Sequence, residues 1–120
     1  MIDIMPKQRL SPLPSAAFHI LLSLADEDLH GYAIMRSVEE QTEGRMRLGP
    51  GTLYSSIQAL LEEGAVEEIS GKLDHEPGHA RRRYYHLTQA GRKLAQTEAN
   101  RMADLLRIAR SKRILRGDHV

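Results

Sequence analysis

Hydrophobic positions along the chain follow helical spacing in four segments and alternate with polar positions in two shorter ones. Residues 14–25 are apolar around most of the helix circumference, so the first helix should be largely buried, and Pro14 suits its first turn. Residues 29–41 predict a second, amphipathic helix with Asp28 as its N-cap. The expected buried face of this helix comprises Gly31, Ile34, Met35 and Val38.

A third helix is expected over residues 50–63, because Pro50 and Gly51 mark its start and Gly64 follows its end. Its apolar residues fall within about 100° of the helical wheel, with Tyr54 at the edge of that arc. They are Leu53, Ile57, Leu60 and Leu61. The opposite side carries small polar residues, and acids occur only in the last turn.

Two further segments favour β-strands. Residues 65–69 contain Val and Ile, and in residues 81–87 Tyr85 and Leu87 point to one side of the expected strand. The segment between them contains Gly and Pro, which are typical of a turn. The two strands should therefore form an antiparallel hairpin with a long tip.

A long fourth helix is predicted over residues 89–111, with Thr88 as its N-cap. Its apolar residues cover nearly half of the wheel, which is more than packing on one small domain requires. We therefore expect a homodimer, built by the first and fourth helices. The expected dimer residues are Phe18, Leu22, Leu94, Met102, Leu105, Leu106, Ile108 and Ala109.

The order of these elements predicts a mainly α fold with a small β-hairpin, a winged helix-turn-helix. Residues 1–13 read as an irregular arm, and residues 14–88 as the winged helix-turn-helix domain. Residues 89–120 read as a C-terminal dimerisation helix with a basic tail. On this interpretation the second and third helices form the helix-turn-helix pair, and the hairpin is the wing.

The polar face of the third helix is the first candidate for a DNA contact. A recognition helix enters the major groove by its N-terminal end, where carboxylates would be repelled and backbone N–H groups favour anions. Small hydroxyl and amide groups can bind phosphates and base edges, and Gly lets the backbone approach closely. The candidates are Gly51, Thr52, Ser55, Ser56 and Gln58. An ordinary solvated helix face has the same composition.

Cations on the expected wing are the second candidate. Lys72, Arg81, Arg82 and Arg83 lie on the hairpin near its tip, where they suit phosphate or minor-groove contacts. An edge strand protected by charge would look similar. Charge is also unequal along the chain: residues 1–80 hold 6 Lys/Arg and 13 Asp/Glu, whereas residues 81–120 hold 11 and 3. This asymmetry indicates either an anionic partner or pairing of a basic helix with acidic ones.

Other classes of function receive little support. The segment "HEPGH", His75 to His79, matches a zinc-protease pattern that works only on a helix, and its Pro and Gly oppose a helix. We expect no enzyme, no metal site and no cofactor. The chain has no Cys, and its longest apolar run, residues 16–25, is too short to span a bilayer. A cytoplasmic protein without membrane contact is expected.

Three blocks of sequence resemble the PadR-type transcriptional regulators. These are "HGYAI", "GTLY" and "YYHLTQAG", which occur in the family's order and spacing within residues 20–110. The resemblance implies a dimeric winged-helix DNA-binding protein of a bacterial or archaeal cytoplasm, usually a repressor. In such a dimer two recognition helices about 34 Å apart, one DNA turn, should bind a pseudo-palindromic operator. It also implies that residues 50–56, including Tyr54, enter the major groove and that residues 81–83 contact the backbone or minor groove.

By the same resemblance, Tyr32 either meets the phosphates or braces the recognition helix. Some relatives bind phenolic acids or flat hydrophobic drugs, sometimes through a Trp at the dimer interface, but this chain has no Trp. The sequence therefore does not identify a small-molecule effector or show that one exists. The alternative function is a winged-helix module that contacts another protein and does not read DNA.

Overall fold

The computed structural model describes residues 13–69 and 83–116. Its elements are α1 (Ser15–Ser23), β1 (Leu29–His30), α2 (Gly31–Gln41), α3 (Pro50–Glu62), β2 (Val66–Ile69), β3 (Tyr84–Leu87) and α4 (Gln89–Ser111). The predicted mainly α fold, with three helices, a strand pair and a long last helix, is confirmed. Pro14 is the N-cap of α1, one position before the first turn in which the sequence placed it.

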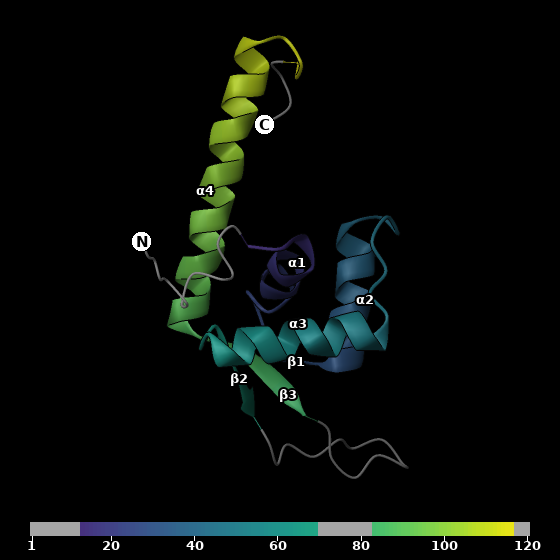
Figure 1. The fold of residues 1–120 in the computed structure, drawn as a ribbon. Helices are drawn as coiled ribbons and strands as arrows, with labels where there is room; N and C mark the ends of the chain where they lie inside the picture. Colours follow the sequence, from purple (N-terminus) through teal and green to yellow (C-terminus); the bar gives the residue numbers. More distant parts are fainter. Residues whose placement is uncertain (1–12, 70–82, 117–120) are drawn as a thin grey trace, which may run out of the picture.

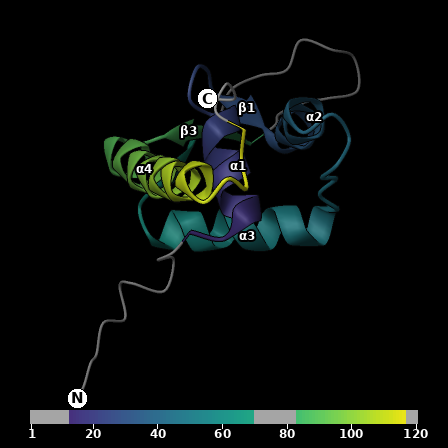
Figure 2. The same cartoon turned by 90° about the horizontal axis from the view of Figure 1, so that it is seen from above.

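Helix α1 lies at the centre of the molecule and contacts each of the other three helices (Figures 1 and 2). Its Ile20 and Leu21 are fully buried, because this short helix is apolar on nearly every side. The buried face of α3 is the predicted one, with Leu53, Ile57 and Leu60 in the core. Other core residues are Leu13, Ala17, Phe18, Leu24, Ile34, Val38, Ala65, Val66, Tyr85 and Leu87.

The sheet has three strands in the order β1-β3-β2, and both pairs are antiparallel. In the hairpin, Val66 pairs with Leu87 and Glu68 pairs with Tyr85. Tyr85 and Leu87 are buried on one face of β3, as their alternation predicts. Figure 1 shows the hairpin extending from one end of the molecule, beside α3.

The first strand corrects the predicted start of the second helix. Leu29 and His30 pair with Tyr85 and Tyr84 instead of beginning the helix, so α2 starts at Gly31. The N-cap is His30, whose ring Nδ1 accepts a hydrogen bond from the Ala33 N–H at 3.2 Å. Asp28 is therefore not the cap; its carboxylate lies 2.8 Å from His86 Nδ1 and ties β1 to β3. These two residues thus give β3 a second pairing partner instead of lengthening the helix.

The N-terminus of α4 is fixed against the hairpin as well as capped. The Thr88 hydroxyl accepts a hydrogen bond from the Gly91 N–H at 2.9 Å, which confirms the predicted cap. The same hydroxyl lies 2.6 Å from the Gly64 carbonyl and 2.9 Å from the Ala65 carbonyl. One side chain thus joins the end of α3, the start of β2 and the start of α4.

Candidate nucleic-acid interface

The outer face of α3 is polar, exposed and without charge over its first twelve residues. Gly51, Thr52, Ser55 and Gln58 are exposed, and Ser56 is half-buried. The first turn holds no acid, and Gly49 at the N-cap supplies no side chain to bind the first N–H groups. This end of the helix therefore offers backbone donors and the positive end of the dipole to an anion.

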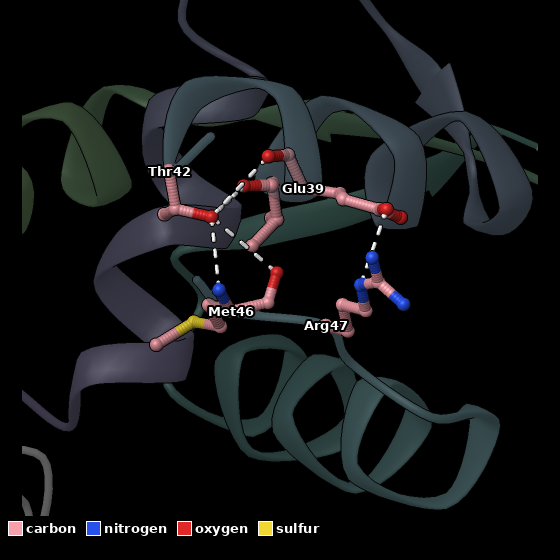
Figure 3. Close-up of polar contacts among 5 residues, drawn as sticks. Glu39, Thr42, Met46 and Arg47 are labelled. Carbon is pink, nitrogen blue, oxygen red and sulfur yellow. Dashed lines mark hydrogen bonds and ion pairs between the residues drawn. The ribbon is translucent and has the colours of Figure 1, made fainter. Parts of the chain in front are cut away.

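The turn between α2 and α3 sets the position of α3. The Thr42 hydroxyl donates to the Val38 carbonyl at 2.9 Å. It also accepts a hydrogen bond from the Met46 N–H at 3.0 Å, and Figure 3 shows these two residues facing each other. Arg47 Nε lies 3.3 Å from Glu39 Oε2, which adds an exposed ion pair across the same turn. The threonine holds the end of α2 to the segment that leads into α3, so it helps to orient the exposed face.

A groove of about 320 Å³ joins α2, α3 and the sheet beside this face. Three predicted DNA-binding residues from distant parts of the sequence meet there: Tyr32, Tyr54 and Arg83. The two tyrosines are exposed to 60% and 49%, so both rings are available to a large ligand. The guanidinium of Arg36 lies 5.7 Å from the centre of the Tyr32 ring and adds a second cation at this edge.

Tyr54 packs directly on the start of α2. A β-carbon added at Gly31 would lie 2.3 Å from the Tyr54 hydroxyl oxygen, so the observed position of the tyrosine side chain leaves room only for glycine there. This contact couples the recognition-helix candidate to the helix before it. It also explains why Gly31 and Tyr54 belong to one surface although they are far apart in the sequence.

The wing contributes one described cation to the groove. Arg83 Nε lies 3.5 Å from Glu68 Oε2, and the two side chains are 76% and 32% exposed. Such an exposed pair contributes about 0–1 kcal/mol, so a phosphate can displace the carboxylate at low cost.

Burial and the nearby Glu68 raise the pKa of Tyr85, which therefore keeps its phenol proton at neutral pH.

The structure leaves some predicted residues untested and adds others. Lys72, Arg81, Arg82 and the "HEPGH" segment lie outside the described residues. Sequence reasoning missed His30, Gly31 and Tyr85 as groove residues. The signal for the first two was the "HGY" run, in which Gly31 was predicted to lie on the apolar face of the second helix and His30 was given no role.

The predicted dimer residues fall into two groups. Phe18 is only 7% exposed, and Leu94 and Met102 pack partly buried on the same core, so one chain already covers most of their surface. The second group remains open to a partner: Leu22, Leu105, Leu106 and Ile108 are 36–52% exposed, and Ala109 is half-buried. The distal half of α4 therefore carries an uncovered apolar side.

Within residues 13–69 and 83–116, no helix is both long and apolar enough to cross a membrane. The same residues contain no cluster of three or more His, Cys, Asp or Glu side chains suited to a metal ion. The described part of the chain therefore gives a metal or membrane role no support.

Three helices followed by a hairpin wing define a winged helix protein. The model of the transcriptional regulator PadR-like family matches residues 20–97. Among curated proteins, an uncharacterized 37.1 kDa protein in transposon TN4556 of Streptomyces fradiae is 42% identical over 86 residues, covering 72% of this chain and 22% of that protein. The chain spans only 22% and 27% of the lengths of the curated relatives it matches.

Solved structures share the fold. A transcriptional regulator from Clostridium thermocellum superposes with a TM-score of 0.67 at 24% identity, covering 80% of this chain and 87% of that one. Bacillus subtilis PadR in complex with operator DNA superposes with a TM-score of 0.60 at 19% identity, covering 70% and 47%. Since the family model matches well over half of the chain, the protein belongs to the PadR-like family of transcriptional regulators.

Proposed function

We propose that this chain is a sequence-specific DNA-binding regulator, a cytoplasmic homodimeric repressor that binds a pseudo-palindromic operator. The observation that carries the proposal is the exposed, charge-free N-terminal face of α3 next to the groove of Tyr32, Tyr54 and Arg83. Membership of the PadR-like family supports it. Bacillus subtilis PadR, which shares the fold, has been solved with operator DNA.

In the proposed complex, α3 enters the major groove by its N-terminal end. Ser55 and Gln58 then face base edges, because they lie on the exposed side of the helix. Both side chains have weak intramolecular contacts that DNA can replace. The Ser55 hydroxyl donates to the Thr52 carbonyl at 3.2 Å, and Gln58 Nε2 donates to Glu62 Oε2 at 3.3 Å.

The groove beside α3 is proposed to hold the DNA backbone. Phosphate contacts fix the position of a protein on the duplex without reading sequence. Arg83 can bind a phosphate once Glu68 is displaced, and the phenols of Tyr32 and Tyr54 can donate hydrogen bonds. Arg81, Arg82 and Lys72 would extend this contact along the wing.

The homodimer is proposed from the exposed apolar side of α4. Leu105 and Ile108 are each about half exposed, which is unusual for two large apolar residues on one short stretch of helix. A two-fold dimer would place two α3 helices about 34 Å apart, one turn of DNA, so the operator should be an inverted repeat. We assign no small-molecule effector in this scheme.

The base preference of α3 variants tests whether α3 contacts base edges or is only an ordinary solvent-exposed helix. Gln58→Ala and Ser55→Ala should each change the sequences bound more than the overall affinity, with about 1–3 kcal/mol of discrimination lost for Gln58, whose amide can bind a base edge bidentately. The measurement is binding to an array of duplex sequences. Gln96→Ala is the matched control, since Gln96 is exposed on α4 and away from the groove.

Unchanged preference in both α3 variants would remove α3 from the proposed reading role. Binding that does not weaken as salt rises would instead favour a module that contacts proteins, because phosphate contacts always release counterions.

A further inference from the structure

The end of α4 forms a basic tip, residues 112–116. Arg113 has a positive φ of 65°, which costs a residue with a side chain about 1–2 kcal/mol. Two backbone hydrogen bonds hold this turn, from the Ile114 N–H to the Ala109 carbonyl at 2.8 Å and from the Arg113 N–H to the Arg110 carbonyl at 3.0 Å. The turn leaves Ile114 80% exposed. Lys112, Arg113 and Arg116 are exposed around it.

A matching acidic groove of about 420 Å³ lies between α1 and α2. Its apolar part includes Leu22, which is 42% exposed, with Leu29 and Ala33. Its acids are Asp26, Glu27 and Glu40. The groove also holds one cation, Arg36, whose guanidinium lies by the Tyr32 ring. Three carboxylates against one guanidinium leave the groove acidic, with apolar side chains beside them.

The tip cannot reach the acidic groove of its own chain. Helix α4 has 23 residues in one continuous run, about 35 Å long. Figure 1 shows its far end standing clear of α1 and α2, and Figure 2 shows α1 between α4 and α2. A second copy is the occupant that the chain itself supplies, since its tip carries an exposed apolar residue and cations that complement the apolar side chains and the carboxylates of the groove.

We propose that in the homodimer the basic tip of each copy docks in the acidic groove of the other. Ile114 then covers Leu22, and Lys112 and Arg113 face Asp26, Glu27 and Glu40. Two-fold symmetry makes this contact twice, once in each direction. The exposed side of α4 at Leu105 and Ile108 leads directly to the tip, so both would belong to one continuous interface. The inference rests on the proposed homodimer and names its surfaces.

Disulfide trapping tests the contact directly, because the chain contains no Cys. Full-length Ile114→Cys is mixed with full-length Leu22→Cys and oxidised, and the covalent heterodimer is identified by its mass. Efficient trapping is expected. Gln96→Cys replaces Leu22→Cys in the control mixture, and trapping there should be weak, since Gln96 lies on α4 outside the acidic groove. Equal trapping in both mixtures would overturn the proposal.

Charge reversal provides a second test. Asp26→Lys with Glu27→Lys reverses the groove, and Lys112→Glu with Arg113→Glu reverses the tip. Each variant alone should raise the dimer dissociation constant about tenfold or more, because like charges then face each other. A mixture of the two variants should form heterodimers, in which both contacts are again complementary. Circular dichroism checks that both variants fold.

Homodimers that resist both reversals would contradict this docking. DNA binding is measured on the same samples by fluorescence anisotropy, with a duplex selected by the wild-type chain. A wild-type dimer that binds this DNA but shows no tip contact refutes only the docking surface. Efficient trapping without DNA binding refutes the proposed function and leaves the contact in place.

Discussion

At Gly31 and Gly91 the chain passes so close to other atoms that a β-carbon has no room. At Gly91 that carbon would lie 2.0 Å from the Ala65 carbonyl oxygen, which belongs to the backbone and cannot swing away. At Gly31 the nearest atom is the hydroxyl of Tyr54, at the far end of a half-exposed side chain. The same substitution should therefore have different consequences at the two sites.

Gly91→Ala should destabilise the protein by about 1–3 kcal/mol, although Ala is the better helix former by about 1 kcal/mol. Gly31→Ala should cost less stability, because Tyr54 can rotate outward, but it should weaken DNA binding by disturbing the groove. Urea unfolding and DNA titration measure the two effects. A Gly91→Ala protein as stable as the wild type would contradict the close packing of α4 on Ala65.

Glu98 is a buried carboxylate, only 4% exposed, that ties the start of the described chain to α4. It accepts hydrogen bonds from Arg101 Nε at 3.1 Å and from the Leu13 N–H at 3.4 Å. The hydrogen bond from Arg101, opposed by burial, lowers the pKa of Glu98 below its ordinary value of 4.5. Its ionised form therefore stabilises the fold above that value, and this stabilisation is lost as the pH falls through the lowered pKa.

Glu98→Gln should thus be less stable than the wild type at pH 7, and the difference should shrink as the pH falls below 4.5. Urea midpoints at several pH values measure this difference. Asp104→Gln is the control, since Asp104 makes a similar pair with Arg107 but is 63% exposed. A stability difference that stays constant from neutral to acid pH would exclude an ionised Glu98 as its source.

The sequence predicted the structural roles of only some individual residues. The Thr88 cap was predictable, because capping needs only local chemistry. The burial of Glu98 was not, because it depends on a backbone N–H 85 residues away at Leu13. The Gly31–Tyr54 contact was equally hidden, since it exists only after α2 and α3 have packed.

At the scale of the elements, the helices were predicted well and the sheet incompletely. Apolar periodicity determined the buried face of α3, with Leu53, Ile57 and Leu60. Strand β1 was missed because two residues are too few for a period, and pairing with β3 is a long-range event. The groove that joins Tyr32 and Arg83 was missed for the same reason: three separate elements build it.

The ion pair of the wing gives two substitutions with opposite expected effects on DNA binding. Arg83→Ala should weaken binding to all sequences and reduce the slope of affinity against salt by about one phosphate contact. Glu68→Gln should strengthen binding, because it removes a competing carboxylate 3.5 Å from the guanidinium. DNA titration at several salt concentrations measures both.

Glu67→Gln is the matched control for the wing, since Glu67 is the neighbouring exposed acid on β2 and pairs opposite His86 instead of Tyr85. If Arg83→Ala and Glu68→Gln both weakened binding equally, the pair would be a structural tie of the hairpin, and Arg83 would not contact phosphate.

At the scale of the whole molecule, the exposed polar face of α3 and the exposed apolar side of α4 belong to one proposed arrangement. The charge asymmetry along the chain left open an anionic partner or pairing between basic and acidic helices. The structure accommodates both, with Arg83 at the groove that we propose for the DNA backbone and the basic tip suited to the acidic groove of a second copy. Sequence alone could not separate these roles, because each depends on where a side chain lies in space.

Selection from a random duplex DNA library at moderate salt, followed by sequencing of the retained molecules, tests the central claim most directly. The claim is that two copies read DNA through paired α3 helices. It predicts enrichment of an inverted repeat whose half-sites are centred about 10 bp apart, one turn of DNA. Retention of DNA without any enriched sequence, or no retention at all, would contradict it.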